Sequence, residues 1–411
     1  MESKNRRNKN DAEKNTSDIY TVDFSGHNLK LVPKTLNQYK NCKSLNLSCN
    51  NIESIAEDTF SECLHLKEVK LYANRLHNIP CIRKLPKLEE LQLQFNKITL
   101  CGSYLKYSKN LRVLRLDSNK ISRMKTDEVC PLINLRYIDV SSNNLSSIAC
   151  LNVLTNVEEI HCTHNQIAKI LNLHSLKKLR EFDASNNELT DISGLNSLPN
   201  LSVLTLDSNK ISTLESVGLL KSLQDLRISK NQVCGLTHVI RLFPKLEILD
   251  ISLNKISNFK EVQSLLNFST LKELSLYGNP VVSDAKGKQN IITMLNSLNL
   301  EVFDKVDNNK TSAKNKQSNV MRPLTASQLV STRLIEDQMN NSEICITSFE
   351  DRLKSQFAVV HSMLSDLPSE ASNCTSPSPF ALSRSSSGRL VSQCSSRARI
   401  ESAKAFAAEH F

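Results

Sequence analysis

The sequence predicts an α/β solenoid of about 12 coils, in which short strands form a parallel sheet on the concave side, followed by a mostly disordered tail. Three observations support this fold class. An L-x-L-x-x-N-x-L pattern recurs between residues 22 and 281. Its anchor positions are spaced by 22 to 25 residues, and the composition becomes Ser-rich beyond about residue 305.

The repeat is most regular at its Asn. The anchor positions are His27, Asn50, Asn74, Asn96, Asn119, Asn143, Asn165, Asn187, Asn209, Asn231, Asn254 and Asn279. The preceding leucines alternate with polar residues, as in a strand, and the rest of each coil has rough helical or 3₁₀ spacing. The Asn amide has donors and an acceptor for backbone groups of its own coil and of the neighbouring one. Because one coil cannot bury its leucines alone, we expect the coils to stack around a continuous core.

These motifs resemble the leucine-rich repeat family, and the resemblance covers about residues 19–307. The resemblance implies a horseshoe-shaped domain that binds proteins. The 22-residue spacings between Asn143 and Asn231 resemble the cytosolic short-coil type of the protein phosphatase 1 regulatory subunit subfamily. The pattern at about 280–307 is similar to the cap of such arrays. The chain departs from that subfamily, since it has no Trp, a long tail and no basic-aliphatic-x-aromatic docking motif.

Outside the array we expect a disordered basic and polar segment at 1–18, a linker at 308–347 and a disordered Ser-rich tail at 368–411. Between the last two, residues 348–367 have the spacing of an amphipathic helix. Its apolar stripe consists of Phe349, Leu353, Phe357, Val360, Leu364 and Leu367. Such a helix is marginal alone in water, so it would pack on the repeats, dimerise or bind another protein. A nascent helix without function is the alternative.

Composition limits the possible functions. The 8 Gly in 411 residues disfavour phosphate-binding Rossmann or P-loop folds, which need glycines where backbone meets phosphate. We expect no secretory signal and no transmembrane insertion, because no apolar stretch is long enough. The 12 scattered Cys then indicate reduced thiols and a cytoplasmic protein. The net charge is +10, but no Lys/Arg stripe alternates with aromatic residues, so we expect no nucleic-acid binding.

The alternating strand positions predict an acidic concave face, with twelve acidic and four basic residues. The candidate protein-binding residues are Tyr72, Phe95, Asp117, Tyr137, Asp139, Glu159, His161, Glu181, Asp183, Asp207, Asp225, Asp250 and Tyr277. Such a face would select a basic or mixed protein surface, with the aromatic residues as buried contacts. The alternatives are that solvated strand positions simply favour charge and that the aromatic residues are packing residues.

One group of residues within this face has chemical alternatives. Asp139, His161 and Asp183 fall at the same position of three successive repeats, so they should line up on adjacent strands. Carboxylates around an imidazole could hold a metal ion or perform general acid–base chemistry. No nucleophile, Gly-rich loop or pocket-forming insertion accompanies them. We therefore expect an exposed surface histidine, and we expect no metal, cofactor or catalytic residue.

The sequence thus favours a non-enzymatic protein–protein interaction scaffold that binds its partner on the concave face, with regulation of that partner as one role. Two alternatives stay open. The first is a structural component of a cilium, centrosome or cytoskeleton, in which case the protein would be located in that structure. The second, implied by the family resemblance, is a regulator of a protein phosphatase catalytic subunit.

Overall fold

A computed structural model of the protein describes residues 20–283, 285–295, 300–304 and 306–307. The predicted segments at 1–18, 308–347, 348–367 and 368–411 lie outside the described residues. In the described residues, one sheet contains 14 strands, and their order in the sheet is their order in the chain. Strands β1 to β13 are parallel, and β14 pairs antiparallel with β13.

The strands are short, and all but the last two have three residues. They are β1 (Thr21–Asp23), β2 (Ser44–Asn46), β3 (Glu68–Lys70), β4 (Glu90–Gln92), β5 (Val113–Arg115), β6 (Tyr137–Asp139), β7 (Glu159–His161), β8 (Glu181–Asp183), β9 (Val203–Thr205), β10 (Asp225–Arg227), β11 (Ile248–Asp250), β12 (Glu273–Ser275), β13 (Val302–Phe303) and β14 (Val306–Asp307). The predicted parallel sheet with one strand per coil is confirmed.

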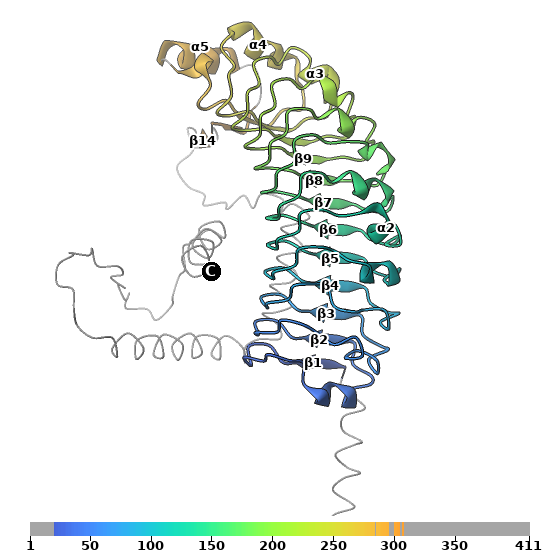
Figure 1. Ribbon diagram of the computed structural model, residues 1–411. Helices are drawn as coiled ribbons and strands as arrows, with labels where there is room; N and C mark the ends of the chain where they lie inside the picture. Colours follow the sequence, from blue (N-terminus) through green and yellow to red (C-terminus); the bar gives the residue numbers. More distant parts are fainter. Residues whose placement is uncertain (1–19, 284, 296–299, 305, 308–411) are drawn as a thin grey trace, which may run out of the picture. The chain divides into compact units, whose positions relative to one another are not determined.

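Short helical turns occupy the other side of many coils. The 3₁₀ helices are η1 (Lys34–Gln38), η2 (Tyr104–Tyr107), η3 (Ala149–Val153), η4 (Leu173–Ser175), η5 (Ser193–Leu195), η6 (Glu215–Val217), η7 (Ser264–Asn267) and η8 (Pro280–Val282). The α-helices are α2 (Thr126–Val129), α3 (Val239–Leu242), α4 (Phe259–Gln263) and α5 (Ala285–Leu295). The repeat array bends towards its strand side, so the strands line the inner face while α2 and α3 lie on the outer one (Figure 1).

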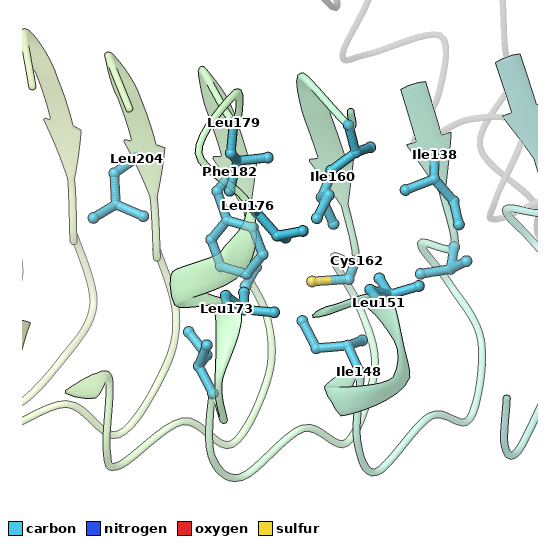
Figure 2. Close-up of a cluster of buried hydrophobic side chains, with 14 of the residues drawn as sticks. Ile138, Ile148, Leu151, Ile160, Cys162, Leu173, Leu176, Leu179, Phe182 and Leu204 are labelled. Atoms are coloured by element: carbon cyan, nitrogen blue, oxygen red, sulfur yellow. The ribbon is translucent and has the colours of Figure 1, made fainter. Parts of the chain in front are cut away.

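The core is a stack of equivalent apolar side chains between the two sides. The central residue of each strand from β1 to β12 is buried, and these residues pair in register along the sheet. Figure 2 shows Ile138, Ile160, Phe182 and Leu204 in such a row, facing residues of the outer turns. Every one of these four side chains is fully buried. Stacking thus buries leucines that one coil would leave in water.

The Asn residues of the repeat form a ladder that joins the coils. In Asn187, Nδ2 donates to the carbonyl oxygens of Cys162 and Ala184, each at 3.0 Å. Its Oδ1 accepts from the backbone N–H of Ile167 at 3.0 Å. The same arrangement recurs in the Asn residues of the other coils. The predicted role of the amide, satisfying backbone groups of two coils, is confirmed.

The residue before each ladder Asn has a left-handed backbone. In ten coils it is not Gly, and its φ lies between 52° and 56°. These residues are Cys49, Ala73, Phe95, Ser118, Ser142, His164, Asn186, Ser208, Lys230 and Leu253. Each such residue costs roughly 1–2 kcal/mol, and the Asn bonds that the turn makes possible offset this cost.

The C-terminal end of the array is covered by α5 and β13. Ile291 and Leu295 of α5 and Phe303 of β13 join the hydrophobic core. One Oδ1 of Asp304 accepts the backbone N–H groups of Leu276 and Tyr277, at 2.7 and 2.9 Å. This carboxylate satisfies backbone donors of the last coil in the way that a ladder Asn does in the preceding coils.

Candidate protein-binding surface

Strand alternation places the predicted binding residues on the inner face. Because Ile160 is fully buried in the core, its neighbours Glu159 and His161 project from the opposite face of the sheet. The same alternation applies to the candidate residues of β6, β8, β10 and β11, namely Tyr137, Asp139, Glu181, Asp183, Asp225 and Asp250. Tyr72, Asp117, Asp207 and Tyr277 lie two residues beyond their strands, and Phe95 lies on the left-handed turn before Asn96.

Ion pairs within single strands neutralise part of this face. Lys70 pairs with Glu68 at 2.9 Å, and Arg227 pairs with Asp225 at 2.9 Å. Arg115 binds Asp117 with two nitrogens, at 3.1 and 3.2 Å. The sequence reasoning missed these pairs, although opposite charges two residues apart along a strand signal them. The negative charge is therefore concentrated in the middle of the array, between β5 and β10.

We call this region the central acidic patch and define it as Asp139, Glu159, Glu181 and Asp183 with the rings of Tyr137 and His161. The register pairs Asp139 with His161 and His161 with Asp183, which confirms the predicted alignment. It also places Tyr137, Glu159 and Glu181 side by side. The rings of Tyr137 and His161 have centroids 5.4 Å apart and are tilted by 37°.

The central acidic patch is more buried than the sequence suggested. His161 and Glu181 are each only 6% exposed, so the expectation of an exposed histidine is wrong. The curved sheet crowds side chains on its inner face, and each strand position has neighbours on both sides. Within the described part of the chain, Nε2 of His161 and Oε2 of Glu159 are buried and have no hydrogen-bond partner. Buried polar atoms normally have one.

Burial also shifts the protonation of the acidic residues. Burial, followed by the charge of Glu181, raises the pKa of Glu159 from 4.5 to about 7. Burial likewise raises the pKa of Asp183, while hydrogen bonds from Ser185 oppose that shift. Burial and the charge of Asp139 raise the pKa of Tyr137. The raised pKa values of Glu159 and Asp183 mean that the free protein holds their negative charges at a cost, which a bound cation would reduce, whereas Tyr137 stays neutral.

Basic residues gather at the edge of the sheet, one position before the strands. Lys67 and Arg112 pair with Glu89, at 2.8 and 3.5 Å. Arg136 and Arg180 approach Glu158, at 3.6 and 3.9 Å. A shallow hollow of about 300 Å³ is lined there by Lys67, Lys87, Glu89, Asn110, Arg112, Asn134 and Arg136. Positive charge thus lies beside the inner face, outside the central acidic patch.

The aromatic candidates are spread along the array. Phe95 is 57% exposed and Tyr277 is 64% exposed, so both rings are open to a partner. Tyr72 is half-buried next to β3, and Tyr137 packs against His161. They do not form one cluster, because β3, β4, β6 and β12 are separated along the sheet.

The described residues lack a metal-binding cluster and a membrane-spanning helix. No three His, Cys, Asp or Glu side chains in this part of the chain are arranged to hold a metal ion. No helix there is long and apolar enough to cross a membrane.

Comparisons with protein-family models match the repeat. A leucine rich repeat model matches residues 40–98, a second leucine-rich repeat model matches 203–330, and a model of two such repeats matches 177–219. Together they cover a little over half of the chain.

Curated proteins are similar over shorter stretches. Osteomodulin of Bos taurus is 32% identical over 121 residues, which are 28% of this chain and 28% of that protein. Human mimecan is 34% identical over 125 residues, 29% of this chain and 39% of mimecan. The protein phosphatase 1 regulatory inhibitor subunit PPP1R7 homolog of Arabidopsis thaliana is 27% identical over 145 residues, 34% of this chain and 44% of the homolog. The chain thus spans less than half the length of each.

Solved structures show the same architecture. An internalin from Listeria monocytogenes has a TM-score of 0.60 at 22% identity, covering 72% of this chain and 89% of the internalin. The APL1 leucine-rich repeat domain has a TM-score of 0.57 at 22% identity, covering 64% of this chain and 68% of that chain. At this identity the likeness establishes the fold.

Proposed function

The chain belongs to the leucine-rich repeat family, and from this premise we propose that it is a non-enzymatic, regulatory scaffold that binds a basic or mixed protein partner on its inner face. Solenoids present extended surfaces, which suit contact with proteins. The observation that supports the proposal most is the central acidic patch. Four carboxylates lie there on three adjacent strands, and no Lys or Arg occupies the inner-face positions of those strands.

The charge on this face would mainly raise the rate at which a partner associates and select between basic and acidic partners. A negative concave surface attracts cationic partners over a distance and repels acidic ones. Exposed Phe95, after β4, and Tyr277, after β12, would add apolar contacts on either side of the patch. The ion pairs at β3, β5 and β10 leave a mixed surface around the patch, which fits a partner of mixed charge.

Charge reversal tests the proposal. In the double variant Asp139→Lys/Asp183→Lys, the central acidic patch changes sign, so partners captured by the full chain from cell extract should be lost. The control Glu53→Lys/Asp58→Lys makes the same net change on exposed residues outside the strands. Quantitative mass spectrometry should find the partners retained by the control. If both variants fold and retain the same partners, the inner face is not the binding surface.

A role as a regulator of a protein phosphatase catalytic subunit is a second candidate. It is supported by the 27% identity to the protein phosphatase 1 regulatory inhibitor subunit PPP1R7 homolog. Purified phosphatase 1 catalytic subunit should then bind the full chain with a measurable Kd, and its activity should change on binding. Absence of binding at micromolar concentrations would reject this candidate and leave the scaffold proposal in place.

The proposal also places the protein in the cytoplasm. A tagged full chain should give a diffuse cytoplasmic signal in fluorescence microscopy. A signal concentrated at cilia or centrosomes would argue for the structural role instead.

A further inference from the structure

Two buried acceptor atoms belong to residues that project from the same face of β7. Ile160 and Cys162 are fully buried and point into the core beside Ile138 and Phe182 (Figure 2). Glu159 and His161 therefore project into the inner face, where His161 is 6% exposed. Within the described residues, Oε2 of Glu159 and Nε2 of His161 have no hydrogen-bond partner. Both atoms are closed to solvent in the free protein, so a ligand reaches them only when the surrounding side chains shift. Leaving such groups unpaired costs about 1–3 kcal/mol each, which favours a ligand that donates hydrogen bonds to them.

The surroundings of these atoms select a cation. Asp139 and Asp183 flank His161 in register, and Glu181 flanks Glu159. Neighbouring parallel strands are about 4.8 Å apart, and like charges directly opposite each other destabilise a sheet. The nearby arginines are already engaged, since Arg115 binds Asp117, and Arg136 and Arg180 approach Glu158 at the edge. A cation from a ligand would therefore relieve repulsion that these described residues leave in place.

The shape of the patch favours a guanidinium over an ammonium group. A guanidinium has five N–H donors in one plane, which can reach several acceptors at once, whereas an ammonium has three donors around a point charge. The rings of Tyr137 and His161, 5.4 Å apart, provide an aromatic wall beside the acceptors. A planar guanidinium gains from stacking against such rings. The neutral imidazole tautomer with its proton on Nδ1 presents an acceptor at Nε2.

We propose that the central acidic patch is a subsite for an arginine side chain of the protein partner. Its guanidinium donates to Oε2 of Glu159 and Nε2 of His161, lies against Tyr137, and is neutralised by Asp139 and Asp183. The inference rests on the proposed function, because it names the part of a basic partner that the inner face recognises. It adds a preference for arginine over lysine, which net charge alone does not give.

Two peptides of equal charge test this subsite on the full chain. The probes are fluorescein-labelled Gly-Arg-Gly-Arg-Gly-Arg-Gly and its counterpart with Lys in place of Arg, measured by fluorescence anisotropy. We expect the arginine peptide to bind at least about fivefold more tightly. Glu159→Gln and His161→Ala should each remove this preference. Glu273→Gln, on the inner face of β12, removes one charge at a distance and should preserve it.

NMR gives a local readout that does not depend on affinity. The Cε1–H signal of His161, assigned by its absence in His161→Ala, should shift on adding the arginine peptide and shift little on adding the lysine peptide. Equal affinities for the two peptides, or an unchanged preference in Glu159→Gln, would overturn the subsite and leave the acidic scaffold intact. A shift caused by Zn²⁺ but not by the peptide would overturn it in favour of a metal site.

The last arm separates the partner from the arginines of residues 308–411. In the variant with Arg322, Arg333, Arg352, Arg384, Arg389, Arg397 and Arg399 all changed to Gln, the His161 signal without peptide should match that of the wild type. A shifted signal would overturn the assignment to a partner and give the subsite to the tail. If neither peptide binds and the charge-reversal variant keeps its partners, the proposed function itself fails.

Discussion

The backbone N–H of Ile121 donates to Oδ1 of Asn143, one coil further along the chain, at 2.9 Å. Nδ2 of Asn143 donates back to the carbonyl oxygen of Leu116 at 2.9 Å and to that of Val140 in its own coil at 3.0 Å. A single side chain thus satisfies backbone groups of two coils. Since the same bonds recur along the array, the ladder joins each coil to its neighbour in addition to the hydrophobic core.

The ladder predicts a large loss of stability in Asn143→Ala. The substitution leaves the buried N–H of Ile121 without its partner. The carbonyls of Leu116 and Val140 each lose one hydrogen bond but keep that from Asn119 or Asn165, so we expect the free energy of unfolding to fall by about 2–4 kcal/mol. The adjacent Asn144 is exposed and provides the matched control, because Asn144→Ala should change stability by less than about 0.5 kcal/mol. Urea unfolding followed by circular dichroism measures both. Equal losses would show that the ladder bonds contribute little.

Much of the fold could be predicted because every coil has the same pattern of buried leucines and the same ladder Asn. The Asn spacing gave the coil length, and the alternation of L-x-L gave the buried face of each strand, as Ile160 and Glu159 show. The register of Asp139, His161 and Asp183 followed from their equal positions in successive repeats.

The depth and pairing of the inner-face side chains could not be predicted in the same way. His161 is buried because strands on both sides crowd it, and a single repeat does not contain that information. The pairing of Arg115 with Asp117 depends on side-chain rotamers as well as on spacing. The left-handed turn at Phe95 gives no signal in residue type, since such turns favour Gly or Asn. Its position before a ladder Asn determines it.

A second prediction concerns how closely the outer turns approach each other. A Cβ added at Gly194 in η5 would lie 2.3 Å from the carbonyl oxygen of Ile170 in the preceding coil. Backbone must move to make room, so Gly194→Ala should destabilise the protein by about 2–3 kcal/mol. At Gly235 the added Cβ would lie 3.6 Å from Oε2 of Glu261, an ordinary contact. Gly235→Ala should therefore be neutral or stabilising by up to about 1 kcal/mol.

Thermal unfolding of the two glycine variants distinguishes a steric cause from a general loss of flexibility. The coil packing described for η5 requires Tm to fall for Gly194→Ala alone. If Tm fell by the same amount for Gly235→Ala, the close approach to Ile170 would not be the reason.

A third prediction follows from the titration of Glu159, whose pKa burial raises to about 7. The charges of Glu181 and Glu158 also raise it, whereas that of Arg180 lowers it. Between about pH 4.5 and 7 the folded chain keeps a proton that the unfolded chain has released. This contribution to stability is therefore fully present below about pH 4.5 and is lost as the pH rises through about 7.

The variant Glu159→Gln removes this titration and keeps the shape of the side chain. It should be more stable than the wild type at pH 8, by about 1–2 kcal/mol after allowing for partial solvent access, and equally stable near pH 4.5. Urea unfolding at both pH values measures the difference. Glu273→Gln on β12, where the side chain is half-buried and lies outside the central acidic patch, serves as the matched control for the loss of one charge. A Glu159→Gln variant that is less stable at pH 8 would mean that the carboxylate is satisfied in the free protein.

The pair of Asp225 and Arg227 allows a double-mutant cycle on the inner face. Nη2 of Arg227 lies 2.9 Å from Oδ2 of Asp225, and Nε lies 3.1 Å from Oδ1. Asp225 is only 7% exposed, so Arg227→Gln leaves a buried carboxylate without its cation. We expect a loss of about 2–3 kcal/mol, because breaking a buried ion pair from one side costs more than replacing both partners. In Asp225→Asn/Arg227→Gln most of that stability should return. Chemical denaturation of the two single variants and the double variant gives the coupling energy, and additive losses would show that the two side chains act independently.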